Sequence, residues 1–221
     1  MYLIKLEGIK MDIEYKVYTI KDTIIDDISI VFTNEEKDYI KRIFLSNPNN
    51  NSEALALNAY DELKIASIDD LTDYLKTLVS NIKAYLNGED IKFKLDNLDL
   101  SNLTPFQYKV LMAEYHTHKN EVNTYKELAK AAGSPRAYRA VGNVLAKNPF
   151  PIIIPCHRTV KSDNSIGGFN GFQAGIESKA ILLKIDGVYV DKRKVLSESP
   201  IISKDNKQTK FDMKYVLKPI K

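Results

Sequence analysis

An apolar segment bracketed by prolines is the feature that most restricts how this chain can fold. Residues 149–155 read PFPIIIP, with Asn148 before them and Cys156 after them. Each proline limits the backbone to a narrow range of conformations, which lowers the entropy cost of holding the next residue in one position. We therefore expect a kinked apolar strand that runs through the core and presents Cys156 at its rigid end.

Cys156 is the only cysteine in the chain, and His157 and Arg158 follow it directly. A thiol has a pKa of about 8.5, so at neutral pH it is a good nucleophile only where its surroundings stabilise the thiolate. The adjacent imidazole and guanidinium could do so, which makes Cys156 a candidate nucleophile. The alternative is a buried structural cysteine, the usual role of a single cysteine inside cells. A cysteine hydrolase is disfavoured, because a contiguous Cys-His pair places the imidazole poorly and no oxyanion loop is evident.

Composition narrows the class of protein. With 44% hydrophobic and 28% charged residues, the chain can build a core. One cysteine excludes an internal disulfide, and His116 and His118 stand apart from it in expected surface loops, so we expect no metal site and no cofactor. No apolar stretch approaches the roughly 20 residues that span a bilayer, and the acidic start lacks a secretory signal. We expect a cytoplasmic protein with no membrane partner.

Charge divides the chain into three parts. Residues 1–97 carry 12 basic and 18 acidic side chains, residues 98–190 carry 11 and 7, and residues 191–221 carry 9 and 4. Seven of the nine glycines lie between Gly133 and Gly187. We expect an N-terminal domain over 1–97, a second domain over 98–190 and a basic extension over 191–221. The basic second half is the candidate for contact with a polyanion.

The N-terminal half is predicted to place strands before helices. Short β-branched runs predict paired strands at 15–20 and 24–32, and a capping box at Thr33 predicts a helix to about Leu45. The clearest helix covers 71–86, where apolar residues recur at helical spacing. Its many neighbouring carboxylates are better explained as a solvated face than as an acid–base pair.

Helix starts follow one another in the C-terminal half. Thr104 precedes a proline and has Gln107 as its partner three residues on, which predicts a capped helix. Thr124 with Glu127 forms a second capping box. That second helix is expected to stop at Gly133, which suits the left-handed position after a helix end.

A third helix is expected without a gap, and it completes a helix-turn-helix pattern. It is predicted from Ser134 to Asn148, with a buried side made of Ala140, Val141, Val144 and Leu145. Arg136 and Arg139 lie on its exposed side, where Gly142 would let a nucleic-acid backbone approach closely. The pattern alone is a weak signal, because helical hairpins are common and a solvated arginine pair explains the same residues.

Beyond the apolar segment the sequence predicts a turn, a loop and a last helix. The turn is expected at Asp163-Asn164, and a glycine-rich loop over 167–171 could close over a ligand. The last helix is predicted over 176–185, before Gly187. It brings Asp186 near the site if it packs across Cys156.

The run SPRAYRAVGNVLAKNPFPIIIPCHRTV, over residues 134–160, resembles the active-site region of the O6-alkylguanine-DNA alkyltransferases. The similarity extends over roughly 103–188, and the PCHR core with its upstream NP and RAVG is highly specific. It implies a monomer that binds double-stranded DNA containing O6-alkylguanine and moves the alkyl group irreversibly to its own cysteine. Such a protein reacts once and needs no cofactor, and O4 of thymine is a second candidate substrate.

Carried over position by position, the resemblance assigns the reaction to five residues. Cys156 is the alkyl acceptor, and His157 is the general base, which acts through a water. Asn148 braces the active-site turn, and Tyr125 helps to rotate the nucleotide. Asp186 stands where the family has a glutamate that polarises the histidine. Because aspartate is one methylene shorter, either the contact is looser or the backbone shifts.

The resemblance also assigns the DNA contacts and the pocket. Arg139 fills the space in the base stack after base flipping, on a helix that enters the minor groove. The stretch from Gly171 to Lys179 is longer than the family pattern, which bears on the size of the alkyl group accepted. The other expected DNA contacts are Tyr125, Lys126, Ser134, Arg136 and Gly142, and the expected pocket residues are Pro151, Phe169, Asn170 and Gly171.

The implied fold is α+β. A ribonuclease-H-like α/β domain precedes a helical, winged-helix-like domain that carries the helix-turn-helix. Metal-binding residues that some family members have in the N-terminal half are absent from this sequence. The alternative is a non-catalytic alkyl-lesion sensor or a helix-turn-helix DNA-binding protein. Relatives of that kind lack the acceptor cysteine, so Cys156 argues for transfer.

Overall fold

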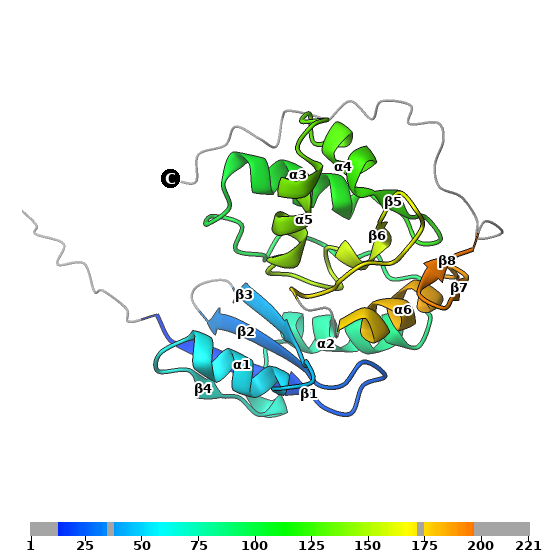
Figure 1. Ribbon diagram of the computed structural model, residues 1–221. Helices are drawn as coiled ribbons and strands as arrows, with labels where there is room; N and C mark the ends of the chain where they lie inside the picture. The colour runs from blue at the N-terminus through cyan, green and yellow to red at the C-terminus, as the bar shows by residue number, and fades with distance from the viewer. Residues whose placement is uncertain (1–12, 35–37, 172–174, 197–221) are drawn as a thin grey trace, which may run out of the picture.

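A computed structural model describes residues 13–34, 38–171 and 175–196 of the protein. Within these ranges it is an α+β protein, as the sequence predicts. In Figure 1 a sheet with helices α1 and α2 occupies the lower part of the view, and helices α3, α4 and α5 occupy the upper part. Helix α6 lies against α2, so a late element of the chain packs on the N-terminal half.

The N-terminal sheet has the strand order β3-β2-β1-β4. β1 (Tyr15–Ile20), β2 (Ile28–Asn34) and β3 (Asp38–Leu45) are antiparallel, and β4 (Lys64–Ile65) runs parallel to β1. The central strand β2 is buried on both faces. Alternate residues face the main core, including Ile28, Ile30 and Phe32, whereas Val31 packs with Val17 and Ala56 of α1 (Ser52–Ala59).

The helix predicted from Thr33 to about Leu45 is wrong, because Asp38–Leu45 forms the strand β3. Residues 35–37, which include the expected cap partner Glu36, lie outside the described residues. The register of β3 against β2 shifts between Val31 and Phe32, as at a β-bulge. The extra residue lets Ile40 and Ile43 both point into the core, and this spacing of three imitates a helical pattern.

The clearest predicted helix is confirmed as α2 (Asp73–Leu86), with Thr72 as its N-cap. Both capping boxes in the C-terminal half are also confirmed: Thr104 starts α3 (Pro105–Tyr115), and Thr124 starts α4 (Tyr125–Ala131). Gly133 follows α4 with a positive φ of 74°, as expected. Each of these helix starts and ends is specified by residues close together in the sequence, and the structure keeps all of them.

The third helix, α5 (Tyr138–Ala146), begins later than predicted. Residues 134–137 form a turn instead, closed by a bond from the Ala137 N–H to the Ser134 carbonyl at 2.8 Å. Val141, Val144 and Leu145 are buried as expected, but Ala140 is exposed.

The apolar segment is fully buried from Phe150 to Cys156, as predicted, but it is not a strand. It forms a turn in which the Ile154 N–H donates to the Phe150 carbonyl at 2.8 Å, and Ile152 has a positive φ of 74°. A β-branched residue in that region is strained, so the surrounding core must hold it there. The turn leads into a short 3-10 helix, η2 (Cys156–Arg158).

The rest of the C-terminal half wraps around this turn. β5 (Asn123–Thr124) and β6 (Thr159–Val160) are parallel, and the chain then turns at Asn164 as predicted, before α6 (Ile176–Ile185). β7 (Val190–Asp191) and β8 (Lys194–Val195) pair after it. The first residues of the expected basic extension therefore pack, with Val195 buried, whereas 197–221 lie outside the described residues.

The two halves of the chain share one hydrophobic core. The outer edge of β3 meets the later chain, because the Ile43 N–H donates to the carbonyl of Pro149 at 2.8 Å. The Ile40 N–H likewise donates to the carbonyl of Asn97 at 2.8 Å, which covers the edge strand. The segment that ends at Cys156 is thus fixed by the N-terminal sheet as well as by its own half.

Candidate active site around Cys156

Asn148 holds the turn that carries Cys156. Its side-chain amide donates to the Ile154 carbonyl at 2.8 Å and to Cys156 Sγ at 3.1 Å. Its Oδ1 accepts from the Phe150 N–H at 3.0 Å. One buried side chain therefore ties both ends of the apolar turn to the sulfur, which is the kind of contact expected for a bracing residue.

Cys156 is only 5% exposed, yet its side chain lines a cavity of about 220 Å³. Burial raises the pKa of the thiol to about 11, although the hydrogen bond from Asn148 opposes this. The resting sulfur is therefore protonated at neutral pH. A purely structural cysteine would account for the burial, but it would not account for a position on a cavity wall.

Asp186, directly after α6, binds the side chains of His157 and Arg158, the two residues that follow the cysteine. Its carboxylate accepts from His157 Nε2 at 2.9 Å and from the Arg158 guanidinium at 2.6 and 3.0 Å. The hydroxyl of Tyr85 donates to it at 3.1 Å. Burial would raise the pKa of Asp186, but the hydrogen bonds and charges of His157 and Arg158 outweigh it and lower that pKa. The carboxylate is therefore ionised.

His157 is completely buried, and burial lowers the pKa of its imidazole despite the nearby carboxylate. The ring is therefore neutral, and its contact with ionised Asp186 assigns the proton to Nε2. Nδ1 is buried and has no hydrogen-bond partner among the described residues. A neutral ring with an unused lone pair on Nδ1 is able to accept a proton.

Arg158 does not stabilise the thiolate as expected from its place in the sequence. Its Nε and one terminal nitrogen bind Asp186, and the other terminal nitrogen donates to the Thr117 carbonyl at 2.7 Å. The guanidinium thus fixes the carboxylate and ties it to the end of α3.

Tyr85 of α2 belongs to this site, and the sequence did not predict it. Its hydroxyl lies 3.1 Å from His157 Nε2 and 3.1 Å from an Asp186 oxygen. Burial raises the pKa of the phenol, so it remains a donor. The only signal was a tyrosine on the apolar face of a helix, and most tyrosines in such positions simply pack in a core.

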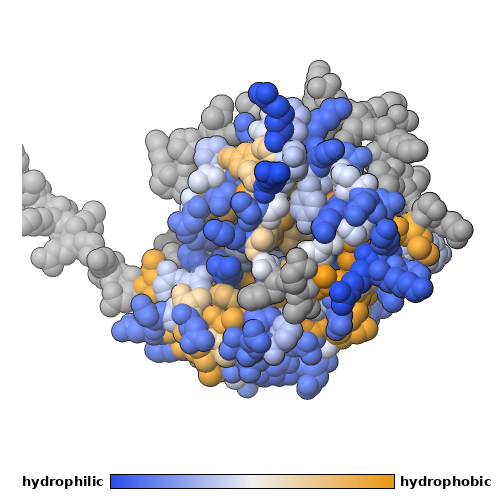
Figure 2. Space-filling model, in the orientation of Figure 1, coloured by the Kyte–Doolittle hydropathy of each residue, from blue (hydrophilic) through white to orange (hydrophobic). Residues whose placement is uncertain are grey.

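The cavity beside Cys156 lies between α5 and the loop at 168–171. It brings together six of the expected site residues, and it adds Gly168 of the expected glycine-rich loop and two residues of α5, Leu145 and Ala146, that were not expected there. The six are Tyr125, Gly142, Cys156, Phe169, Asn170 and Gly171. Pro151 is buried and is not one of the lining residues. Burial raises the pKa of Tyr125 to about 12, so its hydroxyl can donate a hydrogen bond into the cavity. In Figure 2 hydrophobic surface shows in the central hollow of this face, between hydrophilic residues.

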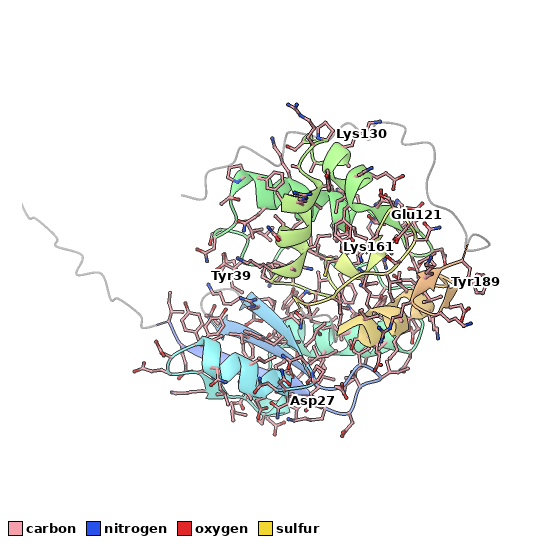
Figure 3. All side chains as sticks on the ribbon, in the orientation of Figure 1. Asp27, Tyr39, Glu121, Lys130, Lys161 and Tyr189 are labelled. Carbon is pink, nitrogen blue, oxygen red and sulfur yellow. The ribbon has the colours of Figure 1, made fainter. Side chains whose placement is uncertain are left out.

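The residues expected to contact DNA lie on the helical half. Lys126, Arg136 and Arg139 are exposed, and Ser134 is half-buried in the turn before α5. Gly142 lines the cavity, where an added Cβ would lie 3.7 Å from the ring of Tyr125. Figure 3 labels two further exposed lysines of this half, Lys130 on α4 and Lys161 after β6.

The described ranges of the chain contain neither a metal centre nor a membrane span. No group of three or more His, Cys, Asp or Glu side chains there could hold a metal ion. No helix there is long and apolar enough to cross a membrane.

Comparison with known protein families matches residues 105–188 to the model described as 6-O-methylguanine DNA methyltransferase, DNA binding domain. The constitutive methylated-DNA--protein-cysteine methyltransferase of Bacillus subtilis is 33% identical over 77% of this chain and 95% of its own length. The enzyme of that name from Methanothermobacter thermautotrophicus is 36% identical, over 53% of this chain and 64% of its own length.

Solved structures agree with these relatives. The O6-methylguanine methyltransferase of Mycobacterium tuberculosis matches with a TM-score of 0.60 at 26% identity, over 79% of this chain and 93% of that one. The O6-methylguanine-DNA methyltransferase of Pyrococcus kodakaraensis matches with a TM-score of 0.58 at 26% identity, over 79% of this chain and 99% of that one. Both matches extend well beyond the helical half, so the N-terminal sheet belongs to the shared fold.

Proposed function

This chain belongs to the methylated-DNA--protein-cysteine methyltransferase family, and we propose that it repairs DNA by moving an alkyl group from O6 of guanine to its own Cys156. The observation that carries the proposal is the position of that thiol. Cys156 lines a cavity, while the neighbouring imidazole is buried against an ionised carboxylate. A nucleophile, a base and room for a substrate thus meet at one point.

The reaction is a displacement at carbon. The thiol gives up its proton, Sγ forms a bond to the alkyl carbon, and the bond from that carbon to O6 breaks with its electron pair left on guanine. The guanine then takes up a proton. The product is a thioether, which does not release the thiol again under ordinary conditions, so each molecule would react once. Methyl transfer from O4 of thymine would follow the same course.

His157 is proposed as the base that removes the thiol proton. Because burial raises the pKa of Cys156 to about 11, the thiolate must be generated at the moment of reaction. Nδ1 of the neutral ring can take the proton, through a water as in the family, while Asp186 stabilises the imidazolium that results. We expect His157→Ala to slow single-turnover transfer by about 10²- to 10⁴-fold. His116→Ala, at an exposed histidine, is the control and should leave the rate unchanged.

The remaining roles concern the nucleotide. Guanine O6 is hidden inside a duplex, so the base has to leave the stack, at a cost of a few kcal/mol. Arg139 would fill the gap, and Tyr125 would rotate the nucleotide and donate to the departing guanine. Phe169, Asn170 and Gly171 would hold the base, and Pro151 would support that pocket. Contacts to the DNA backbone would come from Lys126, Ser134, Arg136 and Gly142.

The finer organisation of the molecule is part of the same proposal. A ribonuclease-H-like domain over 1–97 would precede a winged-helix-like domain over 98–190, with a basic extension over 191–221. The protein would act as a cytoplasmic monomer on double-stranded DNA containing O6-alkylguanine. The sheet packed on α1 and α2, and the turn between α4 and α5, support this division.

Intact-mass measurement after mixing with a methylated duplex tests the function. Alkyl transfer adds the mass of one methylene to the protein, without turnover, and Cys156→Ala should bind the duplex but gain nothing. A non-catalytic lesion sensor would bind the same duplex with no change in mass. Mass gained by Cys156→Ala would move the acceptor to another residue, and no gain by the unaltered protein would refute transfer.

A further inference from the structure

A buried polar cluster lies near Cys156 and has no place in the reaction described above. It consists of Glu114 on α3, Thr159 on β6 and Lys179 on α6, each no more than 1% exposed. The Thr159 hydroxyl donates to Glu114 Oε2 at 2.5 Å, and Lys179 Nζ donates to the Thr159 carbonyl at 2.6 Å. Thr159 directly follows the 3-10 turn of Cys156, His157 and Arg158, so Glu114 and Lys179 hold that turn from its C-terminal end.

The charges of Glu114 and Lys179 are buried without an ion pair between them. Among the described residues no ion pair joins Glu114 to Lys179, and Glu114 Oε1 is buried without a hydrogen-bond partner. Burial raises the pKa of Glu114 to about 7 and lowers the pKa of Lys179 to about 8. Both groups therefore change charge close to neutral pH, unlike an ordinary carboxylate or ammonium.

The charged and titratable groups that interact with the Glu114 carboxyl come from several elements. Lys179 of α6 and Arg158 of η2 favour its charge. The negative charge of Glu114 in turn raises the pKa of Cys156 in η2 and of Tyr125 in α4. Lys161 acts on Lys179 from the turn after β6. A thiolate on Cys156 would thus form beside a second buried negative charge whenever Glu114 is ionised.

We propose that Glu114 controls the reactivity of the Cys156 thiol as a positioning residue, which acts through Thr159 and disfavours the thiolate when it carries its negative charge. The inference rests on the proposed alkyl transfer for its biological meaning. With Glu114 protonated, the positive charge of Lys179 acts on the thiolate without this opposing charge and favours it. With Glu114 ionised, repulsion between two buried anions opposes it. The site thus contains a second ionisation, separate from the pair formed by His157 and Asp186.

Glu114→Gln tests the charge while it keeps the size of the side chain and an oxygen for Thr159. Because Cys156 is the only cysteine, the rate of its alkylation by iodoacetamide reports on that thiol alone. We expect equal rates for the two proteins below about pH 6, and a roughly three- to tenfold faster reaction of Glu114→Gln near pH 7.5 to 8. The difference should persist at higher pH, because Glu114 remains ionised there. Glu177→Gln, the same change at an exposed position of α6, should match the unaltered protein.

Thr159→Val provides a second test if Glu114→Gln does not fold. Without the hydroxyl donor the carboxyl of Glu114 ionises at higher pH, so the slowing of the thiol should also begin at higher pH. Thr159→Ser keeps the donor and should restore the original profile. Identical pH profiles for Glu114→Gln and the unaltered protein would overturn the proposal, as would a loss of rate by the same factor at every pH.

Single-turnover transfer from a methylated duplex, measured in the same buffers, separates this inference from the proposed function. If the iodoacetamide profiles differ as expected and neither protein accepts methyl groups, Glu114 controls the thiol and the proposed function fails. If both proteins accept methyl groups with the same pH profile, the function stands and the role of Glu114 is refuted.

Discussion

Asp186 makes close contacts with its partners although aspartate is one methylene shorter than the glutamate of the family pattern. Its distances to His157 and Arg158 lie between 2.6 and 3.0 Å. Of the two outcomes open from the sequence, a looser contact or a shifted backbone, these distances favour the second. The end of α6 sits close enough for the shorter side chain to reach both partners.

Substitution of Asp186 tests this fit. Asp186→Glu should slow single-turnover transfer, because the longer side chain would push its carboxylate into buried donors. A rate equal to or above that of the unaltered protein would show that the space exists and that the backbone has not adjusted.

Asp186→Asn tests the charge through stability. The pKa of Asp186 is lowered in the folded protein, so its stabilising contribution is present above the unfolded value of about 4 and is lost as pH falls through the folded value. We expect Asp186→Asn to cost about 3 kcal/mol or more at neutral pH, because it leaves buried Arg158 without its counter-charge. Its stability should also fall less on acidification. Denaturant midpoints measured from pH 2 to 7 check both expectations. If the stability of the two proteins fell in parallel on acidification, the ionised Asp186 would not be the stabilising group.

The residues of the site divide into those that the sequence could predict and those that it could not. Cys156, His157 and Asn148 lie within nine residues of each other, and the roles proposed for them follow from local chemistry and from the family pattern. Tyr85 reaches His157 from 72 residues away. Nothing near it in the chain records that contact, because only the packing of α2 against the C-terminal half creates it. Glu114 was missed for the same reason.

Elements were predicted well where their signals were local and poorly where packing decided. Thr104 and Thr124 carry complete capping boxes and start their helices as expected. The sequence of β3 imitates a helix because the bulge near Lys41 disturbs its alternation. α1 was missed because its cap, Asn51, lies in a polar run that also suits a loop, and the cap contact to the Ala54 N–H at 2.8 Å is visible only in the structure.

Helix α5 gives a prediction at this scale. Arg139 is exposed near the start of α5, at the end remote from Asn148. If it holds the duplex open after the base leaves, Arg139→Ala should slow transfer from a methylated duplex far more than transfer from free alkylguanine. Lys126→Ala is the comparison, since removal of a phosphate-binding charge lowers DNA affinity broadly and reduces its salt dependence. The measurement is a pair of second-order rate constants for each variant, and equal losses on both substrates in Arg139→Ala would show that the arginine supports the fold or the pocket.

At the scale of the whole molecule, the N-terminal half contributes directly to the surroundings of Cys156 and His157. Its strand β3 binds the backbone of Pro149, and its helix α2 supplies Tyr85. The sequence predicted two domains from charge and glycine content, and those properties report on surface and loops. They carry no information about a shared core, which joins the halves here.

Tyr85→Phe should therefore lower stability and transfer together. It removes one donor from the buried carboxylate of Asp186, which costs about 1 to 3 kcal/mol. We expect a lower melting temperature and a slower single-turnover rate, because His157 loses a neighbour that fixes its orientation. Tyr138→Phe removes the same hydroxyl from an exposed ring and is the matched control for stability. A full transfer rate in Tyr85→Phe would limit the role of Tyr85 to the fold.

The basic end of the chain is expected to strengthen DNA binding through its charge. Residues 197–221 carry six lysines and three acidic residues, and they lie outside the described residues, so the prediction rests on charge alone. Truncation after Leu196 keeps the β7–β8 pair, in which Val195 is buried. The truncated protein should bind duplex DNA more weakly at low salt, with a slope of log affinity against log salt smaller by about 0.9 for each phosphate that is no longer neutralised. Transfer from free alkylguanine should stay unchanged, because a free base has no phosphate to attract.

A full-length protein with the six lysines changed to glutamine should behave like the truncated one if charge is the cause. Should that protein keep its affinity while the truncated one loses it, the last residues must bind DNA by interactions other than charge, and the electrostatic account of the extension would be wrong.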